Sequence, residues 1–155
     1  MQGNRGMALR VLVAEDEALV ALSLADLCEA EGHAVTLAPD GIKALEAAWR
    51  LGEALDVLVT DLNMPGLGGE DLIRALRAER PGLPVVVVTG SPPWGGAEEL
   101  RRHGGGHGPL VLVHKPVDHD ALLATLRRFA GPEADLPGSG HRMPDAAPVG
   151  SLAAA

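Results

Sequence analysis

Five polar residues that could take part in chemistry stand at the ends of apolar runs in the sequence. They are Glu15, Asp16, Asp61, Thr89 and Lys115. A carboxylate at the end of a buried strand can bind a cation, act as a base or accept a group covalently. A hydroxyl and an ammonium beside it add a hydrogen-bond donor and a positive charge. These residue types therefore indicate a site, provided that the runs end side by side.

Asp61 is the centre of this set, because an apolar run, Leu55–Thr60, leads to it and Pro65-Gly66 then breaks the segment. Several carboxylates in one pocket raise one another's pKa unless a cation neutralises them. Mg²⁺ takes oxygen ligands and keeps positions for water and phosphate. With Lys115 as a second positive charge, the pocket suits an incoming phosphoryl group.

Five short apolar runs alternate with segments of helical periodicity. The runs are 9–14, 34–38, 55–60, 83–89 and 110–113, and the helical segments are about 18–31, 41–51, 69–79, 97–102 and 118–130. Aliphatic and β-branched runs closed by turn residues are typical of parallel strands buried on both faces. The alternation predicts an α/β fold, a doubly wound parallel sheet with right-handed crossovers. The flavodoxin-like (βα)5 strand order 2-1-3-4-5 is the common solution, although other orders stay open on sequence alone.

The fourth helix is predicted to be shortened and irregular. Pro92-Pro93-Trp94-Gly95-Gly96 precedes it and Gly104-Gly105-Gly106 follows, and both stretches are rich in residues that break helices. Trp94 is either a hydrophobic plug under this loop or an exposed anchor for a partner protein.

The composition narrows the class of protein. The net charge is −8 and no basic cluster exceeds an arginine pair, which argues against binding of nucleic acid. No apolar run is long enough to span a bilayer, and the N-terminus lacks the apolar core of a signal peptide. The single cysteine, Cys28, agrees with a reducing compartment. We therefore expect a cytoplasmic protein that neither enters a membrane nor binds nucleic acid.

The expected domain organisation is simple. Residues 1–7 are predicted to be a flexible N-terminus, 8–130 one folded domain, and 131–155 a disordered tail rich in Gly, Pro and Ala.

The residues at the strand ends resemble those of a known family. Glu15-Asp16, Asp61-Leu-Asn-Met-Pro-Gly, Thr89-Gly and Lys115-Pro116, in this order, are similar to the receiver domain of two-component response regulators. The resemblance covers about residues 8–130, nearly all of the predicted fold. Each motif alone is weak, whereas all four at matched strand ends form a specific pattern.

The resemblance implies roles for these residues. Asp61 would accept a phosphoryl group from a phosphohistidine on a sensor histidine kinase or histidine phosphotransfer protein. Glu15 and Asp16 would hold Mg²⁺, one directly and one through water, and Asp61 and the backbone carbonyl of Asn63 would complete its ligands. Lys115 would pair with Asp61 and then with the phosphoryl group. Thr89 would turn its hydroxyl inward after phosphorylation.

Two further expectations follow from the resemblance. The peptide bond before Pro116 would be cis, which proline permits. Receivers commonly carry Tyr or Phe three residues before the lysine, and here that position is Leu112. Phosphorylation would then change the partner-binding surface through repacking of aliphatic side chains, or the partner would bind a different face of the domain.

The sequence thus predicts a single-domain response regulator, a monomer or weak dimer that signals through an unknown downstream protein. It would not be an enzyme, apart from catalysing its own phosphoryl transfer and dephosphorylation. The main alternative is an adaptor of the same fold that binds its partner without phosphorylation. A phosphatase of the haloacid-dehalogenase type is disfavoured, because that family places its Asp-x-Asp motif at the first strand.

Overall fold

The computed structural model describes residues 7–131 of the 155. The predicted flexible N-terminus and C-terminal tail lie, except for Met7 and Gly131, outside the described residues. The described chain divides into two units. Ala8–Leu123 contains all strands of the sheet, and the second unit joins Met7 to the residues from Ala124 onward. Within the second unit the Met7 N–H donates to the Ala130 carbonyl at 3.0 Å.

Strands and helices alternate along the chain as the periodicity predicts. The elements are β1 (Arg10–Ala14), α1 (Ala18–Ala30), β2 (Ala34–Ala38), α2 (Gly41–Leu51), the 3₁₀ turn η2 (Gly52–Ala54), β3 (Val57–Thr60), α3 (Gly69–Glu79), β4 (Val85–Thr89), α4 (Gly96–Gly104), β5 (Leu110–His114) and α5 (His119–Ala130). All strand pairs are parallel and the order is β2-β1-β3-β4-β5, so the predicted flavodoxin-like topology is confirmed.

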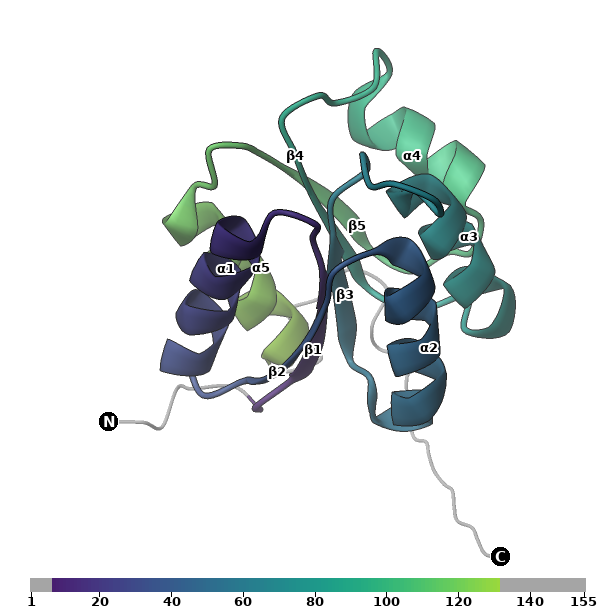
Figure 1. The fold of residues 1–155 in the computed structure, drawn as a ribbon. Coiled ribbons are helices and arrows are strands. Elements are labelled where there is room, and N and C mark those ends of the chain that lie inside the picture. Colours follow the sequence, from purple (N-terminus) through teal and green to yellow (C-terminus); the bar gives the residue numbers. More distant parts are fainter. Residues whose placement is uncertain (1–6, 132–155) are drawn as a thin grey trace, which may run out of the picture. The chain divides into compact units, whose positions relative to one another are not determined.

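Helices cover both faces of the sheet. In Figure 1, α1 lies on one face and α2, α3 and α4 lie on the other. Every residue of β3 and β4 is buried, which agrees with their central places in the strand order. The valine-rich β4 offers no polar face, as expected for a strand packed on both sides. No helix within residues 7–131 is long and apolar enough to cross a membrane.

Side chains fix several helix ends. The Asp40 carboxylate accepts from the Lys43 N–H at 2.8 Å and caps α2. Asp118 accepts from the Ala121 N–H at 3.1 Å at the start of α5. Gly32 follows the end of α1. Its φ angle is 96°, and glycine adopts this conformation without strain. These caps agree with the sequence-based helix boundaries to within two residues.

The fourth helix is longer than predicted. It runs over Gly96–Gly104 rather than 97–102, although it remains shorter than the other α-helices. Gly104 is the last residue of the helix, and α4 lies close against α3 there. A Cβ at this position would lie 2.9 Å from Ile73 Cγ2, so the close approach requires a glycine. The helix ends at Gly105, where φ is 75°.

A buried arginine ties α3 to the segments around α4. The Arg77 guanidinium donates to the carbonyls of Leu83, Gly105 and Pro109, at distances between 2.8 and 3.2 Å. Burial, and next the nearby charge of Arg101, lower the pKa of Arg77 below its ordinary value. The carbonyl cage satisfies the donors of a cation that burial would otherwise penalise.

Candidate functional site

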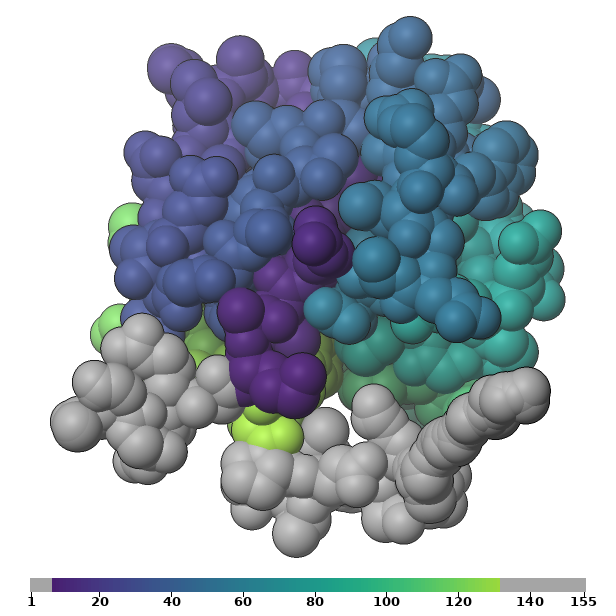
Figure 2. Space-filling view, turned by 90° about the horizontal axis from the view of Figure 1, so that it is seen from below, coloured from purple at the N-terminus to yellow at the C-terminus, as the bar shows by residue number. Residues whose placement is uncertain are grey.

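The strand register brings the polar ends together at one edge of the sheet. Ala14 pairs with Thr60 across β1 and β3, so Glu15 and Asp61 leave their strands side by side. The Asp61 N–H donates to the Ala14 carbonyl at 3.1 Å and continues this pairing by one residue. At the same edge, after β4 and β5, the Lys115 N–H donates to the Thr89 carbonyl at 2.9 Å. Figure 2 views the opposite edge, where the purple residues that lead into β1 lie at the surface.

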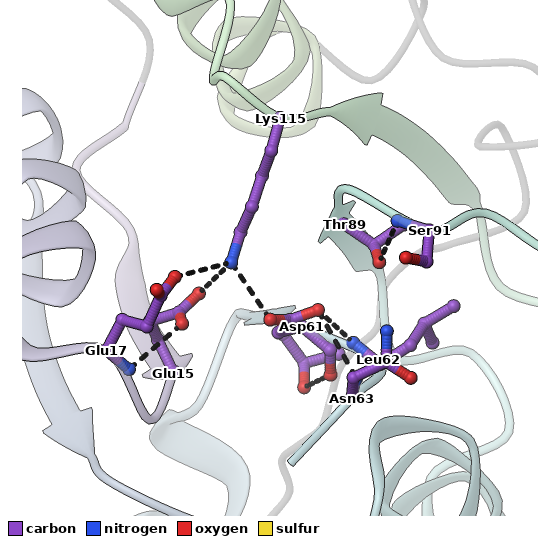
Figure 3. Close-up of polar contacts among 9 residues, drawn as sticks. Glu15, Glu17, Asp61, Leu62, Asn63, Thr89, Ser91 and Lys115 are labelled. Atoms are coloured by element: carbon purple, nitrogen blue, oxygen red, sulfur yellow. Dashed lines mark hydrogen bonds and ion pairs between the residues drawn. The ribbon is translucent and has the colours of Figure 1, made fainter.

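Asp61 is buried, and both of its carboxylate oxygens are engaged (Figure 3). Oδ1 accepts from the Leu62 N–H at 2.6 Å and from the Asn63 N–H at 3.3 Å. Oδ2 lies 2.9 Å from Lys115 Nζ. The side chain is therefore held as an oriented carboxylate at the end of β3.

The backbone behind Asp61 requires a glycine. A Cβ at Gly69, the first residue of α3, would lie 2.2 Å from the Asp61 carbonyl oxygen. The N-terminus of α3 thus packs directly against the loop that carries the carboxylate.

Lys115 is the central cation of the site. Its ammonium contacts Asp61, Glu15 Oε1 at 3.1 Å and Glu17 Oε1 at 3.5 Å, as Figure 3 shows. Burial alone would lower the pKa of Lys115, but its pairing with Asp61 and Glu15 outweighs burial and holds the pKa above its ordinary value. Lys115 is therefore charged whenever these carboxylates are ionised.

Glu15 is buried at the end of β1. Burial raises its pKa above the ordinary value, while the Glu17 N–H, which donates to Oε2 at 3.1 Å, and Lys115 act in the opposite direction. Among the described residues, Oε1 has no hydrogen-bond partner; it is paired with Lys115 only as an ion pair. A fully buried carboxylate oxygen without a hydrogen bond is a position that a cation would stabilise.

Three carboxylates could share such a cation. Ligand atoms of Glu15, Asp16 and Asp61 all lie within 4.8 Å of one another. Asp16 is exposed and the other two are buried, so the set opens to solvent on one side. Hard oxygen donors around an opening to water fit Mg²⁺, which keeps several water ligands when bound.

Thr89 is fully buried at the end of β4, and its Oγ1 accepts from the Ser91 N–H at 3.1 Å. Its hydroxyl is thus tied to the loop that leads to α4. Leu112, in the position where the resemblance implies an aromatic residue, is partly buried and packs against the core on the face covered by α2, α3 and α4. Trp94 is fully exposed, so the interpretation as a plug under the loop is wrong.

The structure thus brings together Glu15, Asp16, Asp61 and Lys115, and places Thr89 at the next strand end. Asn63 lies beside Asp61 through its N–H, while a role for its carbonyl stays a prediction. The Lys115-Pro116 peptide bond is cis, as expected. Sequence reasoning missed Glu17 as a partner of Lys115. The signal available was the third consecutive acidic residue after β1.

Known proteins are similar to this chain in sequence and in fold. The family described as response regulator receiver domain matches residues 11–127. The chain is 35% identical over 127 residues to the probable transcriptional regulatory protein TcrX of Mycobacterium tuberculosis, covering 82% of this chain and 52% of that protein. It is 36% identical over 128 residues to the two-component response regulator PhoP of Pseudomonas aeruginosa, covering 79% of this chain and 54% of that protein. A response regulator receiver protein from Pseudomonas putida superposes with a TM-score of 0.65 at 28% identity, covering 77% of this chain and 96% of that one.

Proposed function

Because the chain belongs to the response regulator receiver domain family of two-component systems, we propose that Asp61 is its phosphoacceptor. The observation that supports this proposal most strongly is the environment of the Asp61 carboxylate. It is buried and oriented by two backbone N–H groups, with the Lys115 ammonium 2.9 Å away. A nucleophile fixed in this way, beside a cation that can stabilise added negative charge, suits phosphoryl transfer.

The proposed reaction is a direct transfer between proteins. A carboxylate oxygen of Asp61 attacks the phosphorus of a phosphohistidine, and a P–O bond forms as the P–N bond breaks. The leaving imidazole keeps the electron pair of the broken bond and takes up a proton from solvent. Lys115 then pairs with an oxygen of the phosphoryl group. The Thr89 hydroxyl leaves the Ser91 N–H and donates to another of these oxygens.

The reaction is proposed to depend on Mg²⁺ held by Glu15, Asp16, Asp61 and the backbone carbonyl of Asn63. When bound, the ion would neutralise the clustered carboxylates and stabilise negative charge on the phosphoryl oxygens. The hydrogen-bond-free Oε1 of Glu15 and the close carboxylate set support this assignment.

The proposed donor is a sensor histidine kinase or a histidine phosphotransfer protein. Such a donor must cover the rim of the site to bring its histidine to Asp61. The rim continues into α1, where Leu19 is 82% exposed and Leu22 is 54% exposed. Both leucines line a shallow groove of about 430 Å³ that also includes Leu27 and His119. The exposed leucines could contact an apolar side chain of the donor.

Incubation with acetyl phosphate and Mg²⁺, followed by intact mass spectrometry, tests the proposal. We expect the mass of one added phosphoryl group on the wild-type protein, none on Asp61→Asn, and none on the wild type when a chelator removes the metal. Absence of an adduct on the wild type would contradict the proposal and favour an adaptor that binds its partner without phosphorylation.

The donor surface has its own test. Leu22→Glu should slow transfer from an autophosphorylated histidine kinase while leaving the rate with acetyl phosphate unchanged, because only the protein donor contacts α1. Equal slowing with both donors would argue against this surface. The chain spans about half the length of the curated relatives TcrX and PhoP, so the expectation of a stand-alone regulator stays a prediction.

A further inference from the structure

Lys115 has a third carboxylate partner that the proposed chemistry does not use. Glu17 Oε1 lies 3.5 Å from Lys115 Nζ, 98 residues away in the chain. The Glu17 side chain is 65% exposed, whereas that of Glu15 is 1% exposed. Figure 3 shows Glu17 beside Glu15, on the side of the ammonium away from Thr89. Glu17 is thus the outermost negative charge around the ammonium.

A role as a helix cap does not account for this side chain. Glu17 occupies the N-cap position of α1, yet its side chain makes no capping hydrogen bond to the helix. Glutamate is also not among the residues that N-cap positions favour, which are Asn, Asp, Ser, Thr and Gly. The backbone of Glu17 supports the site instead, because its N–H donates to Glu15 Oε2 at 3.1 Å.

A contribution to stability does not account for it either. An ion pair with an exposed partner contributes little to folding, because water screens it. Lys115 already has two closer carboxylates, Asp61 at 2.9 Å and Glu15 at 3.1 Å. What Glu17 adds is therefore negative charge at the opening of the pocket and a pull on the ammonium away from Asp61.

The charge balance shows why this matters. The set of Glu15, Asp16, Glu17 and Asp61 with Lys115 holds four carboxylates and one ammonium. Three negative charges remain when all are ionised, and a bound divalent cation reduces them to one. Without the Glu17 carboxylate the metal-loaded pocket would be neutral. Glu17 thus keeps a net negative charge facing any anion that approaches Asp61.

We propose that Glu17 is a positioning residue that restrains Lys115 and slows phosphorylation of Asp61 by small anionic phosphodonors. This inference rests on the proposed phosphoacceptor function. A small acyl phosphate meets the Glu17 charge as it enters, and it must draw the ammonium away from Glu17.

The test compares initial rates of Asp61 phosphorylation by acetyl phosphate at saturating Mg²⁺. Glu17→Gln removes the charge with little change in size. Glu17→Asp keeps the charge, and Glu29→Gln removes an equal charge from the exposed C-terminal end of α1. Each rate is measured at ~0.05 M and ~0.5 M salt, because salt screens interactions between exposed charges.

We expect Glu17→Gln to react about fivefold faster than the wild type at low salt, which corresponds to about 1 kcal/mol. The difference should shrink at high salt, and Glu17→Asp and Glu29→Gln should stay close to the wild type. Calorimetric titration of the unphosphorylated proteins should show weaker Mg²⁺ binding by Glu17→Gln, since a negative charge has been removed. Faster reaction together with weaker metal binding is a combination that a purely structural defect would not produce.

The outcomes separate this inference from the proposed function. A normal Asp61 adduct with equal rates for the wild type and Glu17→Gln would overturn the inference about Glu17 alone. An equal acceleration by Glu29→Gln would also overturn it, because overall charge would then be the cause. Absence of any adduct on the wild type would overturn both.

Discussion

The ammonium of Lys115 lies 2.9 Å from Oδ2 of Asp61, although 54 residues separate the two in the chain. The pair connects the ends of β5 and β3, between which β4 lies. Lys115 also pairs with Glu15, whose Oε1 has no hydrogen-bond partner among the described residues. One lysine therefore contacts two buried carboxylates, so its loss should affect both stability and chemistry.

Replacement of Lys115 by Met should lower the free energy of unfolding by about 2 kcal/mol, because two buried carboxylates lose their cation. Mg²⁺ should restore part of this loss by replacing the missing charge. Urea denaturation with and without Mg²⁺ measures both effects. Lys43→Met is the matched control, since Lys43 forms an exposed pair with Glu46 at 4.0 Å. Equal losses in the two variants would contradict the account of Lys115.

Gly69→Ala should destabilise the fold, although alanine has a higher helix propensity than glycine. The added Cβ would lie 2.2 Å from the Asp61 carbonyl oxygen and 2.8 Å from Leu62 Cα. Such overpacking costs about 1–3 kcal/mol. Because the loop that carries Asp61 would be displaced, Asp61 should also be phosphorylated more slowly. Gly82→Ala is the control, because the nearest atom to its Cβ, in His107, would lie 3.5 Å away. Thermal unfolding with identical midpoints for both variants would show that the loop tolerates the methyl group.

Phosphorylation should change the fluorescence of Trp94. The Thr89 hydroxyl holds the Ser91 N–H at 3.1 Å, and Trp94 is fully exposed three residues further along the same loop. Movement of the Thr89 hydroxyl toward a phosphoryl group would release this loop. In a Trp49→Phe background, acetyl phosphate and Mg²⁺ should alter the Trp94 emission, and Thr89→Val should abolish the change while Asp61 is still phosphorylated. An unchanged spectrum on a fully phosphorylated protein would refute this coupling.

His33 should make the stability depend on pH. It is buried, its Nδ1 accepts from the Leu9 N–H at 3.0 Å, and burial lowers its pKa despite the opposing charges of Glu31 and Asp56. The unfolded chain therefore takes up the proton first as the pH falls through about 6.5, the ordinary pKa of histidine. The stability contributed by neutral His33 is complete above that pH. It is lost progressively as the pH falls toward the lower pKa of the folded chain.

Between pH ~7.5 and ~5.5 this loss should amount to at most about 1.4 kcal/mol. Urea denaturation at the two pH values measures it. His33→Gln should remove this part of the pH dependence, and His107→Gln, at an exposed position, should leave it in place. The same pH dependence in all three proteins would show that other groups cause it.

Patterns within short segments were sufficient to predict the elements of the fold. Buried parallel strands and amphipathic helices leave a local periodicity, so α3 was predicted with its observed ends, Gly69 and Glu79. The predicted end of α4 falls two residues short, because Gly104 does not break the helix. Gly104 instead permits close contact with Ile73, which depends on a neighbouring helix and leaves no local signal.

The acidic residues and Lys115 were predicted to meet because parallel strands end at one edge, and the register confirms it. Contacts that depend on side-chain direction were not predictable. The contact of Glu17 with Lys115 and the hydrogen bonds of Arg77 to the carbonyls of Gly105 and Pro109 join residues far apart in the chain. Both residues have the sequence appearance of solvated surface charges.

The central claim is that the phosphoryl group is attached to Asp61, and reductive trapping tests it most directly. Borohydride reduces an acyl phosphate on aspartate to the alcohol, so a phosphorylated aspartate becomes homoserine. After treatment with acetyl phosphate, Mg²⁺ and borohydride, peptide mass spectrometry should find homoserine at position 61 and an intact aspartate at position 16. Homoserine at another position, or at none, would contradict the account.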